Sequence, residues 1–390
     1  MKNTLAILGE KPMFKQNEIP FMQPTLPRFE DLESSIRSTI QTGILTKGRY
    51  VEQYEEALAD HLNAPYVVAV SSCTTGLMLT LRELGITGEV LVPSFTFCAT
   101  VHAIVWAGAK PVFVDCEPGA YTIDMSDAER KVTPRTSAIV PVHIFGVPVD
   151  SVRVQEFSDT HGLKVVYDAA HAMGSKSNGV PVGCNGDAEV FSTSPTKLLV
   201  TGEGGFVVTR NAELARLLRV AREYGNPGDY NCTSIGINGR LGEYGSILGF
   251  HSLKMLNDNV EQRNRLAALY RGKLKEIPGI KVQSVPRGTL STFKDLSIEI
   301  DPSEFGMNRD QLAHALRWEN IPTRKYFSPP VHKQMCYDED IFLPITDLVS
   351  SRVLSLPLFA HMPLQFAERV VEALQNIRTH AGAIVQTIKG

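Results

Sequence analysis

The segment from Val166 to Gly205 places an acid and a lysine in two local settings that are typical of a ligand site in an α/β protein. An apolar run leads into Asp168 and two alanines. This pattern predicts a short buried strand with an acid at its carboxyl end, where open α/β sheets bind their ligands. Lys197 follows 29 residues later in a serine-rich turn. A glycine-rich loop comes directly after it and lets the backbone approach a bound group.

Each of the two residues has an ordinary explanation when it is taken alone. Asp168 can cap the helix that follows its strand, and Lys197 can be a solvated loop cation. Taken together, they meet the needs of one cofactor. Pyridoxal phosphate requires a lysine amine for a Schiff base and an aspartate that keeps its pyridine nitrogen protonated. We therefore expect pyridoxal 5'-phosphate as an internal aldimine on Lys197, with Lys197 and Asp168 as the catalytic residues.

The sequence around this pair resembles the DegT/StrS-like nucleotide-sugar aminotransferases, from about Gly43 to the last helix. The motifs that carry the resemblance are Asp168-Ala169-Ala170-His171, Phe191-Ser192 before Thr196-Lys197, and Gly202-Glu203-Gly204-Gly205. The resemblance implies the fold-type I aspartate aminotransferase architecture. That architecture is an α/β domain with a mostly parallel mixed sheet, followed by a smaller α+β C-terminal domain. We expect the larger domain to span residues 1–251, including an N-terminal arm, and the smaller one residues 252–390.

Hydroxyl-bearing residues between a predicted strand and a predicted helix offer a phosphate site. Ser71 to Gly76 form this turn, and unpaired N–H groups at a helix amino terminus attract anions. Plain N-capping by serine or threonine explains the pattern equally well. We assign Cys73, Thr74 and Thr75 to the cofactor phosphate. Relatives usually have glycine at the position of Cys73. The sequence shows no base that would activate this cysteine, so we do not predict a catalytic thiol.

The resemblance implies further cofactor contacts. Phe97 stacks on the cofactor ring, His171 stacks on it or hydrogen-bonds to it, and Ser192 binds the phosphate. Asn238 lies in a glycine-broken loop that, in the family, reaches across a dimer interface to the phosphate held by the neighbouring subunit. The expected assembly is therefore a homodimer with shared active sites. The structural alternatives are that Phe97 and His171 only pack in the core and that Asn238 lies in a simple tight turn.

The resemblance also implies the reaction. We expect a PLP-dependent transaminase that moves an amino group from an amino acid, L-glutamate, to a nucleotide-linked keto-sugar, dTDP-4-keto-6-deoxyglucose, in amino-sugar biosynthesis. His171 and the run that follows Tyr326 favour the NDP-4-keto-6-deoxyhexose 4-aminotransferases. Tyr326, His332 and Arg240 are the expected substrate residues. The alternatives are amination at C3 of a keto-sugar or of a cyclitol ketone, and a regulator that binds the cofactor or a sugar nucleotide without catalysis.

Composition excludes several other classes. The chain has 390 residues, a formal charge of −3 and 43% hydrophobic residues, which is ordinary for a globular protein. A dedicated nucleic-acid binder would show a basic face. No apolar run is long enough to cross a bilayer, and the N-terminal residues do not form a secretory signal, so we expect a cytoplasmic protein without a membrane partner. The six cysteines include no Cys-x-x-Cys pair, so we expect no metal site and no disulfide framework.

Apolar spacing along the chain predicts alternating strands and helices. This order favours a mostly parallel sheet covered by helices. Because side chains alternate along a strand, Phe95 and Phe97 are expected on the same side of it. The predicted strands are residues 67–70, 90–97, 111–115, 138–143, 165–168, 206–208 and 297–300. The predicted helices are residues 50–63, 77–84, 99–107, 211–224, 252–277, 309–319 and 364–377.

Overall fold

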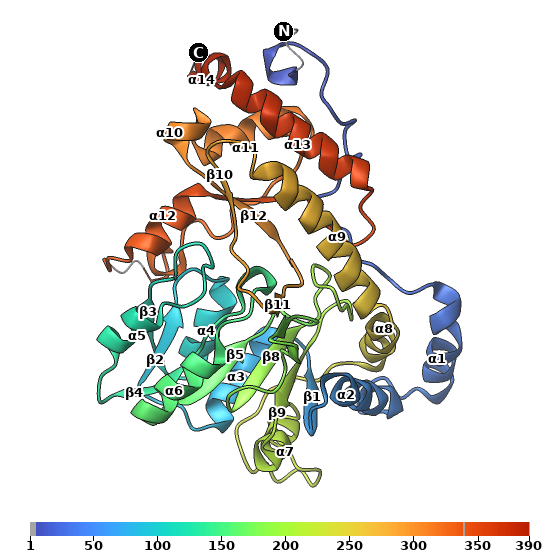
Figure 1. Ribbon diagram of the computed structural model, residues 1–390. Coiled ribbons are helices and arrows are strands. Elements are labelled where there is room, and N and C mark those ends of the chain that lie inside the picture. The colour runs from blue at the N-terminus through green and yellow to red at the C-terminus, as the bar shows by residue number, and fades with distance from the viewer. Residues whose placement is uncertain (1–4, 338–339, 390) are drawn as a thin grey trace.

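The computed structural model describes residues 5–337 and 340–389, and its larger unit, in the lower half of Figure 1, is built on a seven-stranded sheet. The strand order is β1-β9-β8-β5-β4-β2-β3. Neighbouring strands from β8 to β3 pair in parallel, whereas β9 pairs antiparallel with both β8 and β1. The sheet is mixed and mostly parallel, as expected. Its strands are β1 (Tyr66–Val70), β2 (Glu89–Pro93), β3 (Lys110–Val114), β4 (Thr136–Ile139), β5 (Lys164–Asp168), β8 (Ala188–Ser192) and β9 (Gly205–Thr209).

Helices cover both faces of this sheet because successive strand residues point to opposite sides. On one face, Val190 and Val207 pack with α3, α4 and α7. On the other face, Phe191 and Phe206 stack with their ring centroids 4.7 Å apart and join a core with α2, α8 and α9, while α5 and α6 cover its remaining part. These helices are α2 (Arg49–Leu62), α3 (Cys73–Glu83), α4 (Cys98–Trp106), α5 (Met125–Lys131), α6 (Ser151–His161), α7 (Ala212–Ala221), α8 (Glu243–Leu253) and α9 (Leu256–Leu274).

A smaller α+β unit follows, built on an antiparallel sheet of order β10-β12-β13. Its core is apolar and includes the inner face of α9. A further three-stranded ladder pairs β11, which lies between β10 and β12 in the chain, with β6 and β7, which lie between β5 and β8. The elements are β6 (Lys176–Ser177), β7 (Val180–Pro181), β10 (Ile280–Val282), β11 (Thr289–Leu290), β12 (Leu296–Ile300), β13 (Val353–Leu356), α10 (Pro302–Phe305), α11 (Arg309–Trp318), α12 (Pro344–Arg352), α13 (Leu364–Thr379) and α14 (Ala381–Lys389).

The N-terminal segment belongs to the core of this smaller unit. Leu5, Phe14 and Ile19 are buried among its apolar residues. The Glu319 carboxylate accepts hydrogen bonds from the N–H groups of Ala6 and Met13, both at 2.7 Å. The N-terminal arm that was expected in the larger domain therefore packs, over residues 5–19, in the core of the smaller unit. The helix that follows, α1 (Phe29–Thr42), had no prediction.

Two further differences concern the ends of elements. The predicted helix at 252–277 corresponds to α9 and to only the last two residues of α8. The two helices are separated at Lys254 and Met255, so a division between residues 251 and 252 would cut α8. We propose the domain boundary at this break instead. Strand β2 ends at Pro93, so alternation does not extend to the two phenylalanines beyond it. Phe95 is fully buried, whereas Phe97 is 57% exposed.

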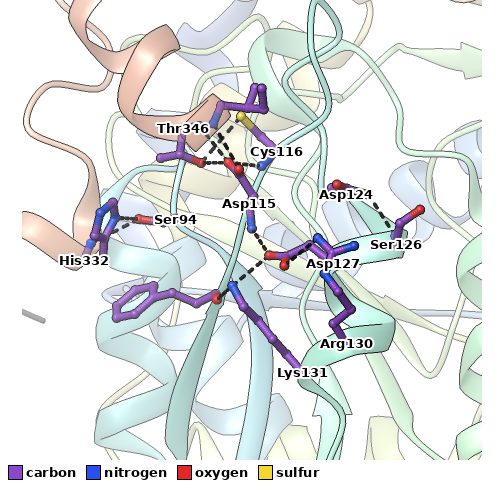
Figure 2. A network of polar contacts seen from close by, with 12 residues as sticks. Ser94, Asp115, Cys116, Asp124, Ser126, Asp127, Arg130, Lys131, His332 and Thr346 are labelled. Carbon is purple, nitrogen blue, oxygen red and sulfur yellow. Dashed lines mark hydrogen bonds and ion pairs between the residues drawn. The ribbon is translucent and has the colours of Figure 1, made fainter. Parts of the chain in front are cut away.

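One buried carboxylate joins the large sheet to the smaller unit. Asp115 follows β3 and accepts hydrogen bonds from the N–H groups of Ile345 (3.0 Å) and Thr346 (2.6 Å) and from the Thr346 hydroxyl (2.7 Å), as Figure 2 shows. These N–H groups belong to the first turn of α12, whose own N-cap residue, Leu343, has no capping side chain. Asp115 therefore caps α12 from a distant part of the sequence.

Replacing this carboxylate should destabilise the whole chain. Asp115→Ala leaves the first-turn N–H groups of α12 buried without partners, so we expect the free energy of unfolding to fall by roughly 2–4 kcal/mol. Urea unfolding followed by circular dichroism measures this loss. Asp159→Ala is a matched control on an exposed helical position, with an expected change within about 0.5 kcal/mol. A similar small change in Asp115→Ala would contradict the capping role.

Candidate active site

A cavity of about 360 Å³ lies at the carboxyl ends of β5 and β8, which meet at one edge of the sheet. Ligands of open α/β sheets bind at this position. A larger cavity of about 590 Å³, between residues 16–19 and 310–325, contains none of the predicted site residues. The residues that were predicted and that line the smaller cavity are Cys73, Thr74, Phe97, Asp168, His171, Ser192, Lys197 and Tyr326.

Asp168 is the last residue of β5 and is 5% exposed. One carboxylate oxygen accepts a hydrogen bond from the Thr100 hydroxyl at 2.7 Å, and the other from the Ala170 N–H at 2.9 Å. Thr100 lies in α4 and was not singled out from the sequence. Hydrogen bonds to both oxygens keep this buried carboxylate in one orientation at the cavity wall.

Lys197 lies in the turn after β8, and its N–H donates to the Ser194 carbonyl at 3.0 Å. Burial, reinforced by the positive charge of Lys294, lowers the pKa of the Lys197 amine to about 8. The negative charge of Asp295 and, less strongly, that of Asp168 oppose this shift. Near neutral pH an appreciable fraction of the amine is therefore unprotonated and can act as a nucleophile or a base.

His171 is held as a neutral ring. Burial is the main cause that lowers its pKa well below the usual value, and the charges of Lys197 and Lys294 add to the effect. Its Nδ1 accepts a hydrogen bond from the Phe145 N–H at 3.1 Å, so the ring proton lies on Nε2. The Phe145 ring stacks on it with an interplanar angle of 11°. His171 can therefore offer an N–H donor or a flat ring surface, and it carries no charge.

The amino terminus of α3 forms another wall of the cavity. Ser72 is the N-cap, and its hydroxyl accepts from the Thr75 N–H at 3.0 Å. A Cβ at Gly205 would lie 2.6 Å from the Cys73 nitrogen, so glycine allows β9 to pass close to this helix end. Burial raises the pKa of the Cys73 thiol well above its usual value, which keeps it protonated. The turn can bind an anion, and its cysteine is not a nucleophile.

Some residues predicted for the site lie outside the cavity. The Thr75 hydroxyl is within 3.0 Å of the hydroxyls of both Ser71 and Ser72. Asn238 is exposed, and Arg240 forms an ion pair with Glu223 at 3.1 Å. Neither of these two lines the cavity of its own chain.

His332 does not fit the expected substrate role. Its side chain is fully buried beneath the surface, and its Nδ1 lies 2.6 Å from the Ser94 hydroxyl (Figure 2). Its Nε2 is 3.4 Å from Asp347 of α12. The residue joins the end of β2 to the smaller unit and is out of reach of a ligand in the cavity. We correct its role to a structural one.

Two charged residues in the cavity were missed from the sequence. Lys294 and Asp295 precede β12, and the Lys294 ammonium lies 2.9 and 3.0 Å from the two carboxylate oxygens of Asp295. No local pattern marked them, because they sit between a polar turn and an apolar strand. Tyr326 and Phe327 complete this side of the cavity, and the Lys294 ammonium is 5.6 Å from the centre of the Tyr326 ring.

Comparison with known proteins assigns this arrangement to a family. Residues 29–375 match the DegT/DnrJ/EryC1/StrS aminotransferase family. The chain belongs to this family. It is 33% identical to a dTDP-4-amino-4,6-dideoxy-D-glucose transaminase of Escherichia coli over 363 residues. The matched region covers 91% of this chain and 98% of that protein. It is thus an aminotransferase of the sugar-modifying family, as expected from the sequence.

Two other relatives show the breadth of the family. A UDP-N-acetyl-3-dehydro-alpha-D-glucosamine 3-aminotransferase of Acidithiobacillus ferrooxidans is 33% identical over 358 residues, which are 90% of this chain and 94% of that protein. The crystal structure of DesI in the presence of its TDP-sugar product superposes with a TM-score of 0.94 at 33% identity and covers all of both chains. The fold-type I architecture is thereby confirmed, and relatives at similar identity are named for amination at different positions of the sugar.

Within residues 5–337 and 340–389, no three His, Cys, Asp or Glu side chains are arranged to hold a metal ion. The same part of the chain contains no helix that is long and apolar enough to cross a membrane.

The lowered pKa of Lys197 can be tested directly on cofactor-free protein. Only the unprotonated amine reacts with trinitrobenzenesulfonate, so modification of Lys197 should rise with pH around a midpoint of about 8 and should be slow below it. A free peptide containing the same lysine should show the ordinary midpoint near 10.4. Peptide mapping by mass spectrometry measures both rates. Equal midpoints would contradict the effect of burial and Lys294.

Proposed function

We propose that the protein uses pyridoxal 5'-phosphate to transfer an amino group from L-glutamate to C4 of dTDP-4-keto-6-deoxyglucose. The observation that carries this proposal is the presence of Asp168 and Lys197 in one cavity, with the hydrogen-bonded acid at a strand end and the amine at a pKa of about 8. The amino-sugar nucleotide would be made in the cytoplasm.

The residues of the cavity fit this cofactor. Asp168 would face the pyridine nitrogen, and the end of α3 with Ser192 would hold the phosphate. The neutral His171 and the exposed Phe97 offer flat surfaces for a ring. When bound, pyridoxal phosphate supplies an electron sink for the negative charge that develops as the donor loses its α-proton.

The protein side chains then have distinct tasks. Lys197 Nζ would take the α-proton of the donor and deliver it to the bound cofactor, and its lowered pKa suits it to act in both directions. The Asp168 carboxylate would lie beside the ring nitrogen of the bound cofactor and favour its protonated form. Tyr326, half-buried on the opposite wall, is our proposed contact for the sugar.

Amination at C3 of a keto-sugar is the second candidate. The relative from Acidithiobacillus ferrooxidans, which is named as a 3-aminotransferase, matches at the same identity as the Escherichia coli 4-amino-sugar transaminase. Support for C4 comes from the Escherichia coli relative, which is named for a sugar with its amino group at position 4, and from His171 beside the acid.

The absorption spectrum and the product test the proposal. Purified protein supplied with pyridoxal phosphate should show a visible band that L-glutamate removes, and then convert dTDP-4-keto-6-deoxyglucose to a 4-amino sugar. Lys197→Ala should lose turnover by more than about a thousandfold, since both nucleophile and base are removed. Product position is determined by mass spectrometry and NMR. Preferential amination of a UDP-linked 3-keto sugar would replace C4 by C3, and a band that glutamate leaves unchanged would exclude this donor.

We further propose that the active enzyme is a homodimer in which Asn238 contacts the phosphate in the cavity of the partner. Asn238 is exposed and does not line the cavity of its own chain, although the adjacent Gly239 carbonyl accepts from the Ser71 N–H at 2.8 Å beside α3. This loop therefore lies at the edge of the phosphate end of the cavity, where a second subunit can approach.

Mixed dimers distinguish this arrangement from a self-contained subunit. Asn238→Ala should weaken cofactor binding, and Lys197→Ala should be inactive. After the two variants are unfolded and refolded together, a hybrid dimer has one cavity with Lys197 from one chain and Asn238 from the other. We expect activity in the mixture to exceed the sum of the separate variants at limiting cofactor. Simple additivity would contradict the shared site.

A further inference from the structure

The buried ion pair of Lys294 and Asp295 lines the cavity, and the roles above give neither residue a contact with a ligand. Both residues line the cavity, and they are only 6% and 4% exposed. Removing two charges from water costs several kcal/mol per ion in typical proteins, and apolar residues often replace such pairs without loss of stability. A buried pair whose charged ends border a ligand cavity therefore suggests a role toward the ligand.

The charges of the cavity show what that role can be. Among the described residues that line it, Lys197 and Lys294 are the cations, since His171 is neutral. The acids are Asp168, Glu203 and Asp295. An amino-acid donor brings a carboxylate bonded directly to the reacting carbon. Lys197 must lose its charge to act as a base, so Lys294 is the cation that remains to offset this carboxylate.

The backbone around Lys294 is held firmly. Its N–H donates to the Phe145 carbonyl at 2.9 Å. The buried Arg263 donates to the Lys294 carbonyl at 2.7 Å and to the Phe293 carbonyl at 3.0 Å. These bonds fix Phe293 in a left-handed conformation with φ of 43°. The ammonium is thus presented on a rigid support, as recognition of a small ligand requires.

The ammonium of Lys294 also keeps unused hydrogen-bonding capacity. It can donate three hydrogen bonds. Within the described part of the chain, its hydrogen bonds go to the Asp295 carboxylate and to no other group. Asp295 orients the ammonium and reduces the cost of burying it, while leaving a donor for a second carboxylate. The nearby Tyr326 ring adds a favourable face for the positive charge.

From this geometry we propose that Lys294 binds the α-carboxylate of the amino-acid donor and that Asp295 positions it. The inference rests on the proposed function, because it requires an amino-acid donor. The diphosphate of the sugar nucleotide is another anion, but it is attached at C1, across the pyranose ring from C4. With C4 near Lys197, the diphosphate lies farther from the cavity floor than a carboxylate on the reacting carbon.

Lys294→Met tests the proposal through binding. The probe is α-methyl-L-glutamate, which has no α-proton and is not turned over; calorimetry on the cofactor-loaded protein gives its Kd. We expect a 10- to 100-fold increase in Kd for Lys294→Met, as is typical for loss of a charged hydrogen bond. The α-carboxamide of the probe should bind the wild type at least tenfold more weakly than the carboxylate probe does. Its Kd should be about the same for the wild type and for Lys294→Met. The Kd for dTDP should change less than twofold.

Two further variants keep the test decisive. Lys294→Met/Asp295→Asn preserves the charge balance if the single variant fails to fold, and it should show the same loss. Lys333→Met removes an exposed lysine that pairs with Asp347 at 2.7 Å outside the cavity, and it should bind both probes normally.

The outcomes separate the two proposals. Unchanged binding of the carboxylate probe by the Lys294 variants, or a loss confined to dTDP, would overturn the role of Lys294 alone. Failure of the wild type to bind the amino-acid probe would overturn the choice of donor and, with it, the role of Lys294.

Discussion

The hydrogen-bonded carboxylate of Asp168 is the interaction on which the remaining structure of the site depends. A carboxylate that is 5% exposed is tolerated because both oxygens accept hydrogen bonds, from Thr100 and from the Ala170 N–H. In this arrangement β5 lies between β4 and β8, and Thr100 of α4 reaches its last residue. The Ala169 N–H, bonded to the Val190 carbonyl at 2.9 Å, keeps the end of β5 joined to β8, which leads to Lys197.

The opposite wall of the cavity depends on contacts between segments far apart in the sequence. The His171 carbonyl accepts from the Thr292 hydroxyl at 2.7 Å, and its ring accepts from the Phe145 N–H. Phe145 in turn accepts from the Lys294 N–H. His171, three positions after Asp168, is therefore linked by hydrogen bonds to the segment that carries Lys294. A shift of the smaller unit against the large sheet would change the separation of the acid and the second lysine.

The sequence alone predicted the features that local pattern encodes. Asp168 was found because it ends a recognisable strand, and Lys197 because it precedes a glycine-rich loop. The alternating order of strands and helices predicted a mostly parallel sheet. Thr100 and Lys294 could not be found in this way. Their importance arises from tertiary contacts, and threonine in an apolar helix or lysine before a strand has no distinctive local signal. His332 was misassigned for the same reason, since its distance from the cavity depends on how its segment packs against Ser94.

Asp115 and Lys294 show why some buried charges in this chain are structural and others face a ligand. Asp115 accepts hydrogen bonds from the backbone of Cys116 and from the backbone and hydroxyl of α12, so its carboxylate is satisfied within the protein. Its removal would therefore affect folding. The Lys294 ammonium, with Asp295 as its sole hydrogen-bonding partner in the described chain, is only partly satisfied. Incomplete pairing is costly in a closed core but becomes useful at a cavity wall, where an incoming anion supplies the missing partner.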